Sequence, residues 1–220
     1  PFVILDGKIK YNALGLMVLD SQQLEVEHFV FHGWQPIKRY FFITKTNGHD
    51  LIEIDDEPAL TVYQRYIGDV QQLQKMINDL HLPIMLVERE KNGYIPLAAA
   101  LNYDNETRTI LLANQVKMEK FTFGLPPVNM IEALAEQFDK NTTRIRNPLF
   151  TLVFSCIARK NYLRQMAVFE YYEMSRHYSH PLAGFFTCGE IAPYPDSTDT
   201  ICHNMTLVAV TIGVKGARDE

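Results

Sequence analysis

The sequence predicts an α+β fold in which mixed, largely antiparallel sheets are covered by helices. The main observation is the order of the elements, because strand-like runs come mostly in pairs and single helical segments separate the pairs. Composition fits a folded domain, since 47% of the 220 residues are hydrophobic and 21% are charged. No short-period repeat is visible, which disfavours a solenoid.

The first third of the chain is predicted to be mostly strands. Lys38–Thr46 and His49–Asp55 flank Asn47-Gly48. Asn-Gly is the strongest short hairpin signal, because both residues of such a turn need a positive φ. Further strands are expected from β-branched and aromatic residues at Pro1–Leu5, Ile9–Leu19 and Leu24–His32.

Helical periodicity recurs along the chain. Pro58 stands at a first-turn position, which suits the start of a helix. Elsewhere apolar residues recur every three or four positions and would form one face of a helix. The expected helices are Pro58–Tyr66, Val70–Leu80, Val128–Asp139 and a long one over Ala158–Tyr178.

The second half supplies the remaining strands. The apolar run Leu149–Cys156 is typical of a central strand that is buried on both faces. Gly184–Ala192 and Met205–Ile212 are predicted to enclose a polar loop. Other expected strands are Ile84–Arg89 and Tyr94–Asn102 around Asn92-Gly93, then Thr109–Ala113 and Lys120–Phe123.

Charge and cysteine usage exclude several classes of function. The net charge is −5 and no long basic stripe is present, which disfavours nucleic acid and anionic membranes as partners. Three cysteines do not suggest a disulfide framework, so we expect a reducing, cytoplasmic location. The longest apolar stretches fall short of the ~20 residues of a membrane helix, and no signal peptide is visible.

We expect the chain to be part of a longer polypeptide, because Pro1 stands in place of an initiator Met and the tail resembles a linker.

Three segments resemble the FIST family of sensory domains. Gly184–Leu207, GFFTCGEIAPYPDSTDTICHNMTL, is similar to the family's C-terminal signature of G-F-[FY]-[TS]-[YC]-G-E-I-x-P, a variable loop and H-N-x-T. Leu152–Lys160, LVFSCIARK, resembles a family strand in which Cys is followed three residues later by Arg. Gly33–Gly68 resembles the seam between the N- and C-terminal FIST units, with Gly-Trp-x-Pro at its start.

The resemblance covers essentially the whole chain and implies its organisation. Residues 1–66 would be the end of a truncated FIST N-terminal unit, 67–214 the FIST C-terminal domain and 215–220 a tail or linker. It also implies a ligand-sensing role in signal transduction, with a small molecule such as an amino acid as ligand. A fused output domain such as a diguanylate cyclase, histidine kinase or chemoreceptor would receive the signal, and a homodimer is a further partner to consider.

Five residues near these motifs are candidates for ligand binding. Cys156 stands at the carboxyl end of the apolar strand, where ligands commonly bind in open sheets. Arg159 could hold a ligand carboxylate with two hydrogen bonds, and Glu190 could pair with an ammonium group. His203 and Asn204 offer donors and acceptors for a polar ligand. Together they would form a cradle for an amino-acid-like molecule.

Each candidate also has a purely structural interpretation. Cys156 could fill a core, since free Cys is among the most buried residue types. Arg159 could form a salt bridge to an acidic neighbour such as Glu190. His203 and Asn204 could hold a turn. Trp34 could line a pocket, although a place in the core is the simpler interpretation.

Two other classes of function stay open from the sequence. Cys156 with His203 could be the nucleophilic pair of a thiol-dependent hydrolase or transferase, with Glu190 or Asn204 as orienting group, although no catalytic signature surrounds the thiol. The chain could also be an interaction domain without a pocket. We expect no metal and no cofactor, because the paired short spacings of zinc sites and glycine-rich phosphate loops are absent.

Overall fold

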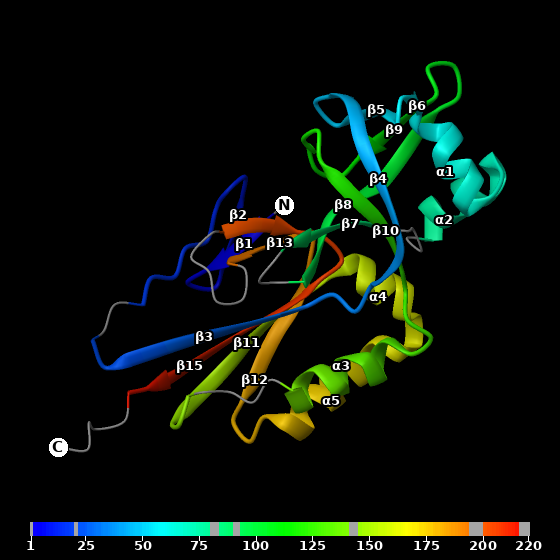
Figure 1. Cartoon of the computed structure of the whole chain (residues 1–220). Helices are drawn as coiled ribbons and strands as arrows, with labels where there is room; N and C mark the ends of the chain where they lie inside the picture. The colour runs from blue at the N-terminus through cyan, green and yellow to red at the C-terminus, as the bar shows by residue number, and fades with distance from the viewer. Residues whose placement is uncertain are drawn as a thin grey trace.

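The structure is a computed structural model that describes residues 2–19, 22–79, 84–89, 93–140, 145–193 and 200–215. It has the α+β class predicted from the sequence. A seven-stranded sheet and a four-stranded sheet form the two main parts, and helices pack against both (Figure 1).

The seven-stranded sheet is a closed antiparallel barrel. Its strand order is β4-β10-β7-β8-β9-β5-β6, and β4 also pairs with β5, so the sheet closes on itself. The Asn47-Gly48 hairpin between β4 and β5 is confirmed, with Gly48 at a φ of 59°. The strands are β4 (Gln35–Asn47), β5 (Asp50–Ile54), β6 (Glu57–Pro58), β7 (Ile84–Arg89), β8 (Gly93–Asp104), β9 (Thr109–Leu112) and β10 (Lys120–Leu125).

The barrel has its own hydrophobic core. Phe41, Phe121 and Phe123 pack against one another inside it. Two helices, α1 (Ala59–Ile67) and α2 (Val70–Asp79), add buried apolar residues to the same core. The first helix was predicted from Pro58 at its start and the second from periodicity. Leu80, at the expected end of the second, lies outside the described residues.

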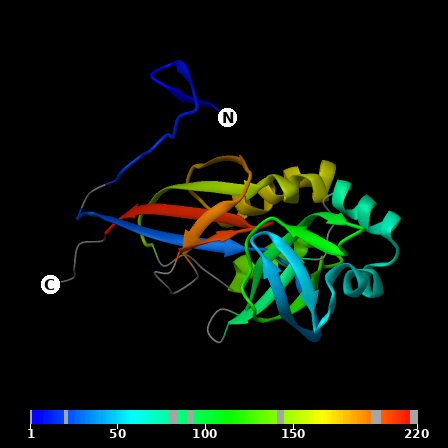
Figure 2. The same ribbon diagram turned by 90° about the horizontal axis from the view of Figure 1, so that it is seen from above.

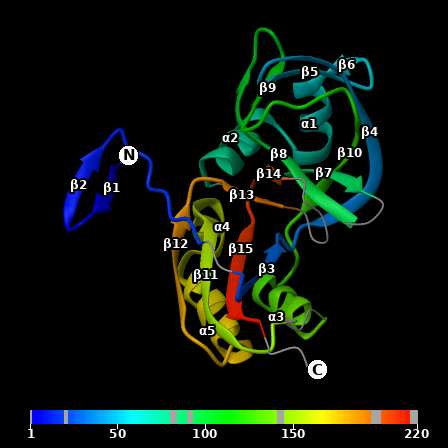
Figure 3. The same ribbon diagram turned by 90° about the vertical axis from the view of Figure 1, so that its left-hand side faces the viewer.

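The four-stranded sheet has the order β12-β11-β15-β3, which Figure 3 displays from left to right. β11 and β12 are parallel, and the other two pairings are antiparallel. β11 lies between two neighbours, as predicted for a central strand, but the predicted burial on both faces is wrong, because most of its residues are only partly buried and Leu149 is 47% exposed. The strands are β3 (Leu24–Phe31), β11 (Pro148–Cys156), β12 (Leu182–Thr187) and β15 (Leu207–Val214).

One face of this sheet is covered by helices (Figure 1). These are α3 (Met130–Lys140), α4 (Ile157–Leu163) and α5 (Ala167–His177). Alternate residues of the strands point toward the helices, so that Phe29 of β3 stacks on Phe138 of α3 with ring centroids 4.6 Å apart. Helices and strands thus share a second core, distinct from that of the barrel.

The long helix predicted over Ala158–Tyr178 is wrong as a single element. A 3₁₀ turn, η1 (Arg164–Met166), separates α4 from α5, and Arg164 has a φ of 53° that an α-helix cannot contain. In a straight helix Arg159 and Glu170 would be roughly 16 Å apart along the axis. The break brings the two side chains into contact.

The predicted strand Gly184–Ala192 is also two elements. β12 ends at Thr187, and β13 (Glu190–Pro193) begins after a turn in which Gly189 has a φ of 92°. A single regular strand would have put Phe186 and Glu190 on one face, but Phe186 is 41% exposed and Glu190 is 3% exposed. β13 pairs with β14 (Thr200–His203), a strand within the expected polar loop, whose residues 194–199 lie outside the described part.

At the amino end the expected strand Ile9–Leu19 is too long. A short hairpin of β1 (Phe2–Leu5) and β2 (Lys8–Tyr11) stands away from the body (Figure 2), and 13–19 form no strand. A strand needs a hydrogen-bonded partner, and in the described structure this apolar segment has none. The pairing of β7 with β8 is as predicted, although Asn92 between them lies outside the described residues. Pro1 and residues 216–220 also lie outside the described part of the chain.

Candidate functional site

The five predicted site residues come from the end of the four-stranded sheet where β11 stops and β15 begins. Cys156 ends β11, and its N–H donates to the carbonyl oxygen of Thr206 just before β15, at 2.9 Å. Arg159 is in the first turn of α4, and Glu190 pairs with His203 across the β13–β14 hairpin. Four of the five are buried, and Asn204 is half-buried.

Arg159 is the centre of a buried hydrogen-bond network. It is 2% exposed, and its Nε donates to Glu170 Oε1 at 3.0 Å while Nη2 contacts the same oxygen. Nη1 donates to the carbonyl oxygens of His32 at 2.8 Å and Met205 at 3.3 Å. The carboxylate that pairs with Arg159 is therefore that of Glu170 in α5. The sequence had suggested Glu190 as an example of such a partner.

Glu190 has partners of its own. Thr187 Oγ1 donates to one carboxylate oxygen at 2.5 Å, and Thr206 Oγ1 donates to the other at 2.8 Å. Burial raises the pKa of Glu190 above its ordinary value, while these hydrogen bonds and the charge of Arg159 favour the ionised form. Both oxygens of this carboxylate are thus used inside the fold.

Cys156 is in the environment of a structural thiol. Burial raises the pKa of its side chain, and the nearby carboxylate of Glu190 raises it further. A nucleophilic thiol needs the reverse, a pKa lowered by cations or a helix N-terminus. Cys156 does precede the N-terminus of α4, but burial and Glu190 outweigh the backbone N–H groups there that lower the pKa of the thiol, which is unfavourable for the thiol-enzyme alternative.

His203 and Asn204 differ in their surroundings. His203 is 1% exposed, its Nε2 lies 3.1 Å from the carbonyl oxygen of Ala192, and burial lowers its pKa. The Nδ2 of Asn204 is buried and has no hydrogen-bond partner within the described part of the chain. A buried amide donor without a partner is costly, which makes this position unusual.

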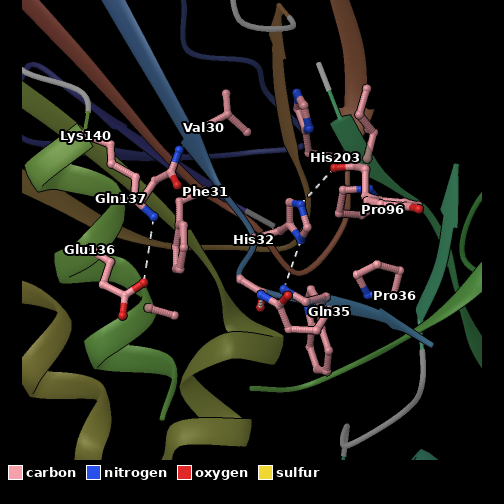
Figure 4. Close-up of a pocket in the computed structure, with 15 residues that line it drawn as sticks. Val30, Phe31, His32, Gln35, Pro36, Pro96, Glu136, Gln137, Lys140 and His203 are labelled. Carbon is pink, nitrogen blue, oxygen red and sulfur yellow. Dashed lines mark hydrogen bonds and ion pairs between the residues drawn. The ribbon is translucent and has the colours of Figure 1, made fainter. Parts of the chain in front are cut away.

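A cavity of about 360 Å³ lies where the four-stranded sheet meets the barrel, and we call it the seam cavity. Of the five predicted residues, His203 alone lines it. Figure 4 shows His32 in the middle of its wall, with Pro36 and Pro96 on the barrel side. On the opposite side α3 contributes Glu136, Gln137 and Lys140 (Figure 4).

His32 is held as a neutral imidazole in this wall. The backbone N–H of Trp34 donates to His32 Nδ1 at 3.0 Å, so that the other nitrogen, Nε2, carries the proton and donates to the carbonyl oxygen of Tyr94 at 2.9 Å. Burial lowers the pKa of His32 to about 4, and the charge of Arg159 adds to this effect. The ring is therefore uncharged near neutral pH.

Trp34 adds a hydrogen-bond donor that the fold does not use. The side chain is 2% exposed and lines the seam cavity, and its Nε1 has no partner among the described residues. Gly33 has a φ of 81°, and a Cβ there would lie 2.4 Å from Met130 Sδ, so a glycine is needed to position the tryptophan. At the rim, Lys140 Nζ lies 3.8 Å from Glu136 Oε2, and both side chains are exposed.

Sequence reasoning missed most of this cavity. The Gly33-Trp34-x-Pro36 motif was a visible signal for part of the wall. His32 and Lys140 carry no local signal, because they reach the cavity only through the packing of β3 and α3. Among the described residues no group of three or more His, Cys, Asp or Glu side chains could hold a metal ion, and no helix is long and apolar enough to cross a bilayer.

Comparison with protein-family models gives two matches that together span most of the chain. The FIST N domain model matches residues 1–57, and the FIST C domain model matches residues 59–193. No curated protein and no solved structure matches the chain significantly. The two matched regions interlock, because β4 and β5 of the first pair with β10 and β9 of the second. The chain belongs to the FIST family, whose domains are generally described as sensory domains in signal transduction.

Proposed function

We propose that this chain is a signal-input domain that binds a small molecule in the seam cavity. The observation that carries the proposal is the wall of that cavity, which contains Trp34 and two imidazoles, His32 and His203. The Nε1 donor of Trp34 has no hydrogen-bond partner among the described residues. Ligand sites are typically concave and mostly apolar with a few polar groups that orient the ligand. A cavity of about 360 Å³ has the size of such a site.

An amino acid or a close derivative is the ligand class that we favour. Glu136 and Lys140 place opposite charges at the rim, 3.8 Å apart. A zwitterion could replace this exposed ion pair by pairing its ammonium with Glu136 and its carboxylate with Lys140. The side chain of the ligand would then point toward Trp34.

This proposal changes the roles assigned to the predicted cradle. Arg159 and Glu190 are buried and hydrogen-bonded to other protein groups, so we infer that they support the wall and do not touch the ligand. Arg159 does so by holding the carbonyl oxygen of His32 at 2.8 Å. His203 keeps its proposed role as a ligand contact, and Cys156 becomes a core residue.

The position of the cavity suggests how occupancy could be relayed. Residues of the barrel, the four-stranded sheet and α3 all line it. A ligand that binds one arrangement of these parts better than another shifts the population toward that arrangement. We propose that a fused output domain, such as a diguanylate cyclase, histidine kinase or chemoreceptor, responds to the shift in the cytoplasm. A homodimer of the chain would be compatible with this relay of ligand occupancy.

A thermal-shift screen against amino acids and their simple derivatives tests the proposal. A ligand that binds only the folded state raises stability, by about 2.7 kcal/mol when its concentration is a hundred times Kd. We expect at least one amino acid to raise Tm. Lys140→Gln should weaken that effect, whereas Glu132→Gln, an exposed substitution on the same helix outside the cavity, should leave it unchanged.

Two results would count against the proposal. One is the absence of a shift with every compound of the screen. The other is a shift that Lys140→Gln leaves intact, since the ligand would then bind elsewhere. An interaction domain without a pocket gives the first result.

A further inference from the structure

A second cavity, of about 450 Å³, lies between α5 and the strands β11 and β12. We call it the helix-edge cavity. It shares no lining residue with the seam cavity. Its walls are mostly apolar, formed by Val153, Ala167, Met174, Leu182, Phe186 and Leu207.

The buried polar side chains of this cavity are Ser155 and Glu170. They are 7% and 3% exposed, so both are more than nine-tenths buried. Ser155 Oγ donates to Glu170 Oε2 at 3.1 Å, and Arg159 donates to Oε1 through Nε and Nη2. A carboxylate can accept about four hydrogen bonds. From the described residues Glu170 receives these three, which leaves room for one further donor on Oε2.

Aromatic rings stand at the mouth of the cavity. Tyr171 of α5 is 56% exposed and Phe186 of β12 is 41% exposed, although both are large and partly apolar. Lys160 lies 5.0 Å from the centroid of the Phe186 ring. Rings placed in this way offer stacking surfaces to a planar molecule.

We propose that the helix-edge cavity binds a small, uncharged aromatic molecule that carries one hydrogen-bond donor, such as a phenol or an indole. Its ring would lie among the apolar walls, and its O–H or N–H would donate to Glu170. Arg159 balances the charge of Glu170, so a charged ligand of either sign would be buried without a counter-charge, which is costly. This site is additional to the proposed amino-acid site.

Isothermal titration calorimetry of the full chain with three para-substituted toluenes tests the ligand class. We expect p-cresol to bind, and 4-methylanisole, which lacks the donor, to bind about tenfold more weakly because the hydrogen bond to a charged acceptor is lost. We expect no binding of 4-methylbenzoate. Equal affinity for p-cresol and 4-methylanisole would overturn the proposed donor contact.

Substitutions then test the location. Tyr171→Ala should weaken p-cresol binding severalfold, and Ala167→Leu should abolish it by filling the cavity. Tyr172→Ala is the matched control, because Tyr172 is on the same helix at 54% exposure and does not line the cavity. Lys140→Gln should also leave p-cresol binding unchanged, which separates this proposal from that for the seam cavity. Binding that survives both Tyr171→Ala and Ala167→Leu would refute the site.

Discussion

Arg159 illustrates how a residue chosen for ligand binding can instead organise a core. The motif Cys-x-x-Arg lies where the sequence predicted it, with Arg159 in the first turn of a helix that follows a central strand. The sequence could not predict which carboxylate would pair with Arg159. Glu170 is eleven residues away and becomes a neighbour only because the helix breaks between them.

Loss of this guanidinium should be severely destabilising. Arg159→Ala leaves Glu170 buried without its cation, and breaking a buried ion pair in this way costs about 3–5 kcal/mol. The exposed pair Arg65–Glu57 is the control, since solvent screens its charges and Arg65→Ala should cost far less stability than Arg159→Ala. Urea denaturation of both variants measures the difference. Similar losses for the two substitutions would contradict the role given to Arg159.

His32 should make stability fall in mild acid. Its pKa in the folded protein is about 4, below the ordinary value of 6.5, so the unfolded chain binds the proton more readily. Stability that is fully present above pH 6.5 is then lost as the pH falls toward 4, by about 3 kcal/mol. The lowered pKa of His203 acts in the same direction, and the raised pKa of Glu190 acts in the opposite one.

Urea denaturation from neutral pH to pH 4 measures this effect. His32→Gln should be less stable at pH 7, because two hydrogen bonds change, but it should lose less stability on acidification. A variant with the same pH dependence as the original chain would show that His32 is not the group responsible.

At the scale of elements, the sequence predicted those helices and hairpins that depend on residues close together in the chain. The Asn47-Gly48 hairpin and the helices α1, α2 and α3 follow from turn residues and periodicity. The breaks at Arg164 and Gly189 were not part of the predicted elements, because tertiary contacts select both positions. The over-long strand at the amino end failed for a related reason, since alternation cannot supply a neighbouring strand.

Arg164 should tolerate glycine better than a bulky residue. Its φ of 53° with ψ of −121° is a conformation that favours glycine, and such strain costs of order 1–3 kcal/mol. We expect Arg164→Gly to raise the free energy of unfolding by about 1 kcal/mol and Arg164→Ile to lower it by a similar amount. Met166→Ile, two residues later at an ordinary helical φ, is the control. Lower stability of Arg164→Gly would contradict this view of the break.

At the scale of the whole molecule, the two family units do not form separate structures. β3 from the region of the FIST N model completes the four-stranded sheet, and β4 and β5 complete the barrel. The sequence suggested paired strands, but barrel closure depends on the pairing of β4 with β10, in which Lys120 pairs with Phe42 and Leu125 pairs with Gln35. No local pattern specifies such a contact.

Interlocked units predict a single cooperative unfolding transition. Far-ultraviolet circular dichroism should report the strands and helices, and the emission of Trp34 should report the seam, with the same midpoint in urea. A fragment of residues 59–215 lacks β3, β4 and β5, so it should not fold. Two separated transitions, or a folded fragment, would show that the parts are independent.

The central claim is that the seam cavity is a ligand site, and Trp34 gives the most direct test of it. Trp34 is the only tryptophan of the chain, so its fluorescence reports this cavity alone. Titration with an amino acid that raises Tm should change the emission of Trp34 in a saturable way, and Lys140→Gln should shift the titration to higher concentration. Emission that stays constant while that amino acid saturates the protein would contradict binding in the seam cavity.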